Sequence, residues 1–152
     1  MGILLALMLT LVTPGMQPVE VVENFFDAVQ TRDGDAAVDC LSEHMIASFS
    51  MVLAMVRADP SVDAEEEIRN AMGLEFAEGE LDTISARGFA VRLLTSDAVY
   101  DAATTTTATC GESWISGDSA FVEMTYSGAE AGLDTLMLVR ESDGWKLQMG
   151  MM

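Results

Sequence analysis

Apolar residues recur three or four positions apart through the first part of the chain, as they do along one face of an α-helix. The clearest stretch begins at Pro18 and carries four such positions: Val19, Val22, Phe26 and Val29. The same spacing predicts three more helices, over residues 35–42, 45–59 and 63–73. The helix over 45–59 must end there, because the residue before Pro60 disfavours the helical conformation. Asp63 and Glu66 predict a capping box for the last of the three.

Residues 82–94 fit two interpretations. Ile84, Gly88 and Val91 lie at helical spacing, which favours a helix. A strand over residues 88–95 is the alternative, because a short apolar run does not distinguish the two by its period alone.

Beyond Ala103 the pattern changes from helical to alternating, which is typical of strands. We expect four strands, over residues 104–115, 119–126, 133–140 and 145–149. The sequences 116–118 and 141–144 are turn signals that join consecutive antiparallel strands. Helices first and strands second predict an α+β fold, with N-terminal helices packed on an antiparallel C-terminal sheet.

The sequence predicts a signal peptide or hydrophobic leader over residues 1–15, followed by a single domain over residues 16–152. The apolar run over residues 3–12 is about half as long as the ~20 residues that cross a bilayer, so we expect no stable membrane span. Its length suits the apolar centre of a secretory signal, which predicts an exported protein, periplasmic or extracellular. No Lys or Arg precedes the run and no clear cleavage site follows it. An uncleaved hydrophobic anchor and a packed N-terminal helix are therefore alternatives.

The charge of the chain excludes one class of partner. Twenty-five acidic residues stand against seven Lys and Arg, so the formal net charge is −18. This field repels phosphate groups, and we therefore expect no nucleic acid as a partner. One histidine and two cysteines are too few for a zinc site built from such ligands, and we expect neither a metal nor another cofactor.

The two cysteines are Cys40 and Cys110. In an oxidising compartment they can form a disulfide, whereas in a reducing one they stay as small apolar residues. A bond across this loop would stabilise the fold by about 4 kcal/mol through the entropy of the unfolded chain. The sequence leaves both states open.

Three stretches share features with a known superfamily. Residues 18–29 form an amphipathic helix with paired aromatics, residues 31–41 turn into a short second helix, and residues 138–147 form a hairpin whose last strand begins with Trp145. In these features the chain resembles the NTF2-like superfamily, which includes ketosteroid isomerases and SnoaL-like cyclases. It is most similar to small exported bacterial members without assigned activity. The resemblance implies a curved, cone-like sheet that wraps the helices around a mostly apolar pocket, and it allows a homodimer formed through the sheet.

The implied pocket defines candidate ligand-binding residues. Alternation along the strands places the side chains of one face together, and we take the face of Trp145 as the concave one. The candidates are Trp114, Met124, Tyr126, Trp145 and Phe49. The alternative is that these side chains simply fill the core.

Candidate catalytic groups are few. His44 is the only imidazole, and we expect Glu112 to share a face with Trp114. An isomerase-like reaction needs a pocket carboxylate and a partner that stabilises an oxyanion. Neither residue has a visible partner in the sequence, so a solvated position is the simpler interpretation. We therefore expect an exported, non-catalytic NTF2-like domain that binds a small apolar ligand or a protein partner. The alternatives are a SnoaL- or ketosteroid isomerase-like enzyme using a pocket carboxylate, and a dimeric assembly module.

Overall fold

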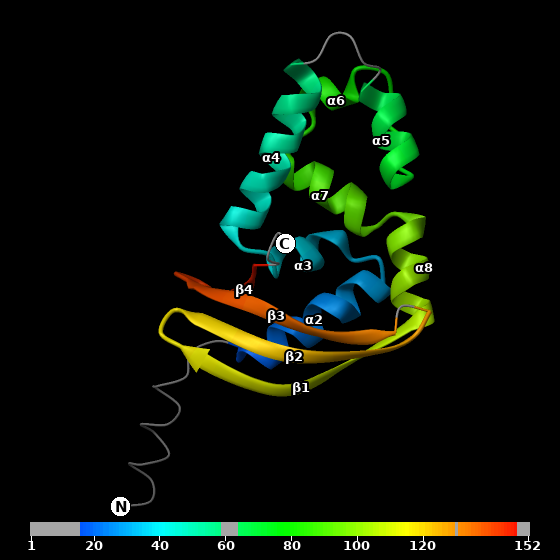
Figure 1. Ribbon diagram of the computed structural model, residues 1–152. Helices are drawn as coiled ribbons and strands as arrows, with labels where there is room; N and C mark the ends of the chain where they lie inside the picture. The colour runs from blue at the N-terminus through cyan, green and yellow to red at the C-terminus, as the bar shows by residue number, and fades with distance from the viewer. Residues whose placement is uncertain (1–15, 59–63, 130, 149–152) are drawn as a thin grey trace, which may run out of the picture.

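The computed structural model describes residues 16–58, 64–129 and 131–148 (Figure 1). Within these ranges the chain forms helices first and an antiparallel sheet second, which confirms the predicted α+β class. The helices are α2 (Pro18–Gln30), α3 (Gly34–Asp39), α4 (Glu43–Ala58), α5 (Ala64–Met72), α6 (Glu80–Thr83), α7 (Ala86–Leu94) and α8 (Asp97–Thr105). The strands are β1 (Thr106–Ser116), β2 (Ser119–Gly128), β3 (Gly132–Glu141) and β4 (Gly144–Leu147).

The helix predictions up to residue 73 match α2 to α5. Pro18 occupies the first turn of α2, where its missing N–H is not needed. Gly73 follows α5 with a φ of 66°, a left-handed conformation that suits glycine. The predicted capping box lies partly outside the described residues, because Asp63 is among those not described.

Residues 82–94 do not form one continuous helix, because α6 ends at Thr83 and α7 begins at Ala86. The part over 86–94 is helical, so the alternative of a strand over 88–95 is wrong. The Ser85 side chain accepts a hydrogen bond from the backbone N–H of Gly88, which caps the start of α7. Phe89 and Ala90 then turn inward and are fully buried. The cap and the buried face together favour helix over strand.

Helix α8 is not predicted by the pattern, and it takes two residues from the expected first strand. The hydroxyl of Thr104 donates to the carbonyl of Tyr100, and the hydroxyl of Thr105 donates to the carbonyl of Asp101. These bonds to the preceding helical turn keep both threonines in α8, although threonine favours strands. Strand β1 therefore starts at Thr106.

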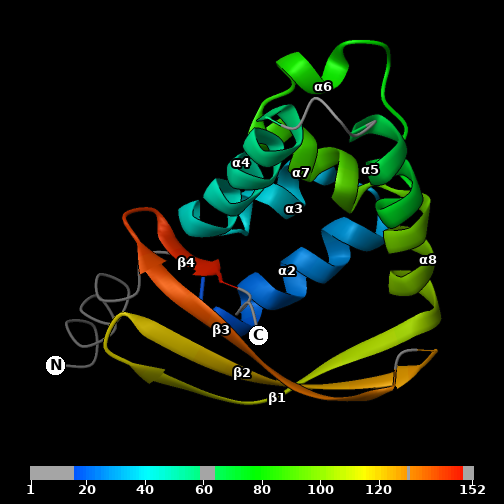
Figure 2. The same ribbon diagram turned by 45° about the horizontal axis from the view of Figure 1, so that its top comes forward.

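The four strands follow one another in the sheet as they do in the sequence, all antiparallel. The sheet is curved, and α2 crosses its concave face, with α3 and α8 beside it (Figures 1 and 2). The α3–α4 connection joins the far edge: the N–H of Leu147 donates to Cys40, and the N–H of Ser42 donates to Leu147. This contact fixes the helical layer to β4.

A β-bulge interrupts the pairing of β1 with β2. Cys110 faces Met124, but the next paired residues are Ser113 and Val122, so β1 carries one extra residue. An inserted residue exchanges the two faces of the strand beyond it. The side chains of β1 after the bulge therefore point opposite to where a regular alternation would put them.

Two clusters of buried side chains hold the helices and the sheet. The first joins α2, α3 and the concave face of the sheet, and includes Val22, Val122 and Leu138, each fully buried. The second lies among α4 to α7 and centres on Phe89, whose ring stacks against Phe76 at 6.1 Å. Phe49 packs against both clusters, so α4 links them.

No helix among the described residues is long and apolar enough to cross a bilayer.

Candidate functional site

An apolar pocket of about 300 Å³ lies where α2 and α8 meet the start of β1. Phe25, Phe26 and Val29 of α2 form one wall, and Leu94 of α7 with residues of α8 forms another. Gln30 and Thr106 are its only polar lining residues within the described chain. We call this cavity the apolar pocket.

The spacing of α2 builds the first wall. Phe25 and Val29 lie four residues apart and are buried, whereas Phe26 is half-buried and turns toward the sheet. The Phe26 ring meets Phe25 at 5.6 Å and Tyr126 of β2 at 6.3 Å, both edge to face. Such aromatic contacts fix the orientation of the rings, so the wall is formed before a ligand arrives.

Small side chains on the other wall leave the space open. Ala102 and Ala103 on α8 and Ala108 on β1 face the cavity, where a larger residue would fill it. The side-chain amide of Gln30 donates to the carbonyl of Ala103 at 3.1 Å and ties α2 to α8 across the mouth. A cavity of about 150 Å³ accommodates benzene, so this pocket has room for a somewhat larger apolar molecule.

The five predicted ligand-binding residues do not line the apolar pocket. Met124 and Trp145 are buried in the first cluster, which agrees with the alternative that they fill the core. Phe49 lies near Phe89, with 5.9 Å between the ring centroids. Tyr126 reaches the pocket indirectly through its contact with Phe26. The residues that do line the cavity come from α2, from the unpredicted α8, and from the ends of α7 and β1 that adjoin α8.

Trp114 lies on the outer face of the sheet, opposite to the predicted one. The bulge after Cys110 reverses the alternation, so Trp114 stacks on Phe121 with 5.4 Å between ring centroids. Its side chain is 46% exposed. The expectation that Trp114 shares a face with Met124 is therefore wrong, because it assumed an uninterrupted strand.

The two candidate catalytic residues are exposed and stay apart from the apolar pocket. His44 lies in the first turn of α4, and Glu112 lies within the bulge of β1. Neither lines the pocket. A catalytic acid or base must lie within hydrogen-bond distance of the substrate. Because neither residue lines the apolar pocket, neither would contact a ligand bound there.

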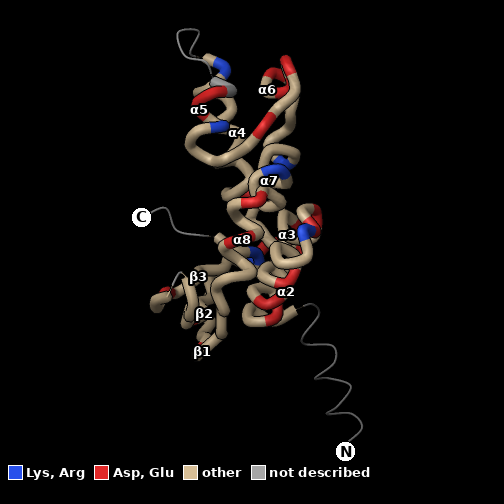
Figure 3. The backbone as a smooth tube through the Cα atoms, turned by 90° about the vertical axis from the view of Figure 1, so that its right-hand side faces the viewer, with Lys and Arg blue, Asp and Glu red and all other residues tan. Residues whose placement is uncertain are grey.

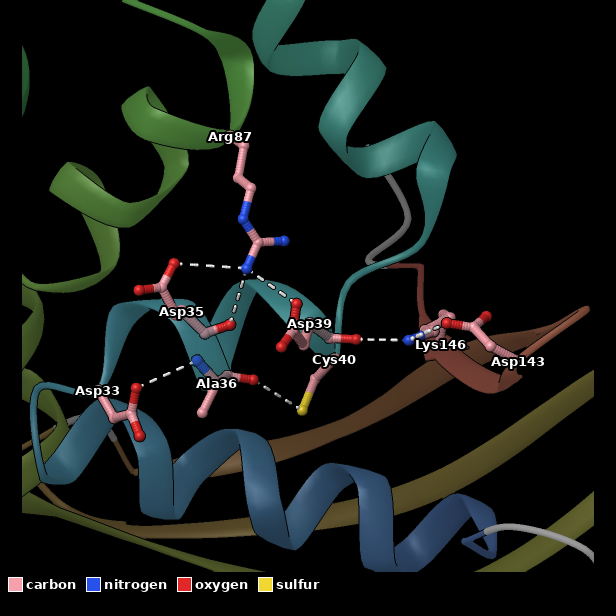
Figure 4. Close-up of polar contacts among 8 residues, drawn as sticks. All are labelled: Asp33, Asp35, Ala36, Asp39, Cys40, Arg87, Asp143 and Lys146. Atoms are coloured by element: carbon pink, nitrogen blue, oxygen red, sulfur yellow. Dashed lines mark hydrogen bonds and ion pairs between the residues drawn. The ribbon is translucent and has the colours of Figure 1, made fainter.

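Charged side chains form a polar junction around the end of α3, defined by Asp35, Asp39, Arg87, Asp143 and Lys146 (Figure 4). The guanidinium of Arg87 contacts Asp39 at 2.8 Å and Asp35 at 3.4 Å, which ties α7 to α3. Lys146 of β4 donates to the carbonyl of Asp39 at 2.6 Å and pairs with Asp143 at 3.1 Å. The hydrogen bond from Lys146 lowers the pKa of the Asp143 carboxyl.

The polar junction connects α3 to α7 and to β4. The ion pairs of Arg87 lie at the surface, where such pairs add little to stability, whereas the Lys146 side chain is largely buried. A cleft of about 500 Å³ borders it between α2, α3 and the β3–β4 turn. Three of the four carboxylates that line the cleft are engaged: Asp33 caps α3, Asp39 pairs with Arg87, and Asp143 pairs with Lys146; the fourth is Asp27.

Both cysteines are free thiols, so the structure does not contain the disulfide that was one of the two expected states. The Cys40 thiol donates to the carbonyl of Ala36 at 3.4 Å, whereas Cys110 lies 3.7 Å from the Met124 sulfur. Burial raises the pKa of each thiol. A raised pKa keeps the thiol protonated and unreactive at neutral pH, so neither is an activated nucleophile. The described part of the chain has no group of His, Cys, Asp and Glu side chains that could hold a metal.

Comparison of the chain with protein-family models, with curated proteins and with solved structures finds no match.

Proposed function

We propose that this protein is an exported, non-catalytic binding domain of the NTF2-like type that takes a small apolar ligand into the apolar pocket. The observation that carries the proposal is the cavity itself, which is walled by apolar side chains except at Gln30 and Thr106. Ligand pockets in proteins have this composition, with a few polar groups that orient the ligand.

The packing around the cavity supports binding rather than core formation. Phe25 and Val29 are held in the first cluster, so the wall of α2 does not collapse inward. The alanines opposite leave a volume that no described side chain fills. Burying a small hydrocarbon there removes apolar surface from water on both sides, at roughly 25 cal/mol per Å².

The absence of a catalytic group in the apolar pocket favours binding over an enzyme. Its described lining holds no carboxylate, imidazole or thiol. A ketosteroid isomerase-like reaction needs at least one of these beside the substrate. Export rests on the apolar run over residues 3–12 and is tested by the compartment in which the native protein is found.

Titration with p-xylene tests the proposed function. We expect saturable chemical-shift changes at the methyl groups of Ala103 and Ala108 in spectra of the full chain. Ala103→Leu adds three carbons to the cavity on a helical position and should weaken binding tenfold or more. Ala98→Leu is the matched control, because Ala98 is exposed on the same helix and does not line the cavity. No saturable binding, or equal loss in both variants, refutes the proposal.

A second candidate function, assembly through the sheet, is favoured by one observation. The exposed Trp114 stacks on the half-buried Phe121 on the outer face, and Met137 lies next to Phe121 in register. Large exposed aromatic side chains are enriched at protein interfaces. Light scattering at low and high salt should show a dimer that Trp114→Ser dissociates. A monomer under both conditions removes this candidate.

A further inference from the structure

We infer that the apolar pocket selects neutral ligands that carry a hydrogen-bond donor and rejects ligands that carry a carboxylate. This inference rests on the proposed function and specifies the ligand class of the same site. It follows from the helix ends, from the one amide and from the absence of a cation among the described lining residues.

Three helices end at the pocket. Gln30 is the last residue of α2, Leu94 is the last residue of α7, and Ala102 and Ala103 belong to the last turn of α8. The C-terminal end of a helix carries a partial negative charge, because its last carbonyl groups point outward along the axis. The N-terminal end of α8 also contributes, because Val99 of its first turn lines the cavity. The three C-terminal ends outnumber it, so the helix ends together favour a donor over an anion.

The amide of Gln30 has a defined orientation. Its nitrogen donates to the carbonyl of Ala103 at 3.1 Å, so its oxygen remains as an acceptor. Gln30 is exposed and lines the cavity, which places this acceptor at the solvent side of the pocket. A hydroxyl group at the end of an apolar ligand would donate to it while the rest of the molecule fills the interior.

No cation offsets this negative environment. The described lining contains no Lys, Arg or His. Arg32, two residues beyond Gln30, pairs with Asp97 at 2.9 Å and lies over the Tyr100 ring at 4.1 Å. Figure 3 shows acidic positions on α2 and α3, but none of them is among the described residues that line the apolar pocket. A carboxylate would therefore enter without a partner, and an unpaired charge in an apolar cavity is costly.

Three para-substituted toluenes separate these effects: p-xylene has no polar group, p-cresol has one hydroxyl, and p-toluate has a carboxylate. Each is titrated into the full chain at neutral pH, with the Ala103 and Ala108 methyl signals as the readout. We expect p-xylene and p-cresol to bind and p-toluate to bind at least about tenfold more weakly than p-cresol.

The Gln30→Met variant tests the acceptor. It keeps the length of the side chain and removes the amide, so p-cresol should bind about three- to tenfold more weakly while p-xylene binds as before. Gln17→Met is the matched control, because Gln17 is exposed at the other end of α2 and its side chain makes no capping bond. Binding of p-xylene also shows that each variant retains the pocket.

The outcomes distinguish the two proposals. If p-xylene binds but p-cresol affinity is unchanged in Gln30→Met, the selection of donors is wrong and the apolar pocket stands. Equal affinity for p-toluate and p-cresol likewise overturns the selection. If neither neutral probe binds to the wild-type protein, the proposed function itself fails.

Discussion

The contact between α3 and α7 depends on the absence of one methyl group. Gly34 begins α3, and a Cβ atom added there would lie 2.7 Å from Cγ1 of Val91 and 2.8 Å from Cγ2 of Thr95. Carbon atoms pack at about 3.5–4.0 Å, so α7 must move away by about 1 Å to accommodate alanine. The same movement lengthens the ion pairs of Arg87 with Asp35 and Asp39.

We therefore expect Gly34→Ala to destabilise the protein. Overpacking of a close contact costs about 1–3 kcal/mol. Alanine recovers up to ~1 kcal/mol, because glycine loses more conformational freedom in a helix. Subtracting this recovery from the middle of the cost range, about 2 kcal/mol, leaves a net expected loss of about 1–2 kcal/mol in the free energy of unfolding. Urea denaturation followed by circular dichroism measures it, with an unchanged slope against urea concentration.

Two controls make this test specific. Gly132→Ala adds a methyl group where no atom lies within 4 Å and the backbone is not left-handed, so its effect should stay within about 0.5 kcal/mol. Adding Val91→Ala to Gly34→Ala removes the closest obstacle and should recover part of the loss, seen as a non-additive double-mutant cycle. The reasoning is refuted if Gly34→Ala matches the wild-type stability, or if Gly132→Ala loses as much.

Three further predictions concern the core, a helix cap and the pH dependence. Phe89→Ala empties a fully buried position and should lower the free energy of unfolding by about 3–5 kcal/mol, as measured by urea denaturation. Phe121→Ala, at a half-buried position on the outer face, should lower it by less. Equal losses would contradict the placement of the second cluster. Ser85→Ala removes the cap of α7 and should lower the free energy of unfolding by about 0.5–2 kcal/mol, while Ser50→Ala at an exposed position of α4 should cause no measurable loss. Burial raises the pKa of the Cys40 thiol above its ordinary value of 9.0, so the contribution of this group is full below about pH 9 and is lost as the pH rises through the native pKa. Between pH 8 and pH 10 the free energy of unfolding should therefore fall less in Cys40→Ala than in the wild type. An equal fall in both proteins would show that the Cys40 thiol is not the cause.

The helices and turns of the chain could be predicted because local signals specify them. The period of apolar positions in α2 and α4, the proline after α4 and the glycine after α5 act within a few residues. The hairpin turns at 117 and 144 carry glycines with positive φ, and they set the order of the strands. These signals suffice for the α+β class.

The pocket could not be predicted in the same way. Its walls come from residues far apart in the chain, such as Phe26 and Ala103, and three of its ten described lining residues lie on α8. The signal for α8 is local but weak: Ser96 caps it, and its threonines bond back to the preceding turn. A run of four threonines favours a strand, because threonine is enriched in strands, and the sequence pattern does not show which threonines bond back to a helix.

The sequence by itself determined the helical and extended segments, their order and the strong negative charge, because each depends on neighbouring residues or on composition. Only the tertiary structure decided which side chains face the cavity. A single extra residue in β1 moved Trp114 to the outer face, since alternation along a strand has a period of two and one insertion exchanges its faces. The cavity exists because α2, α7 and α8 end at one place, and the meeting of three helix ends follows from packing rather than from any local pattern.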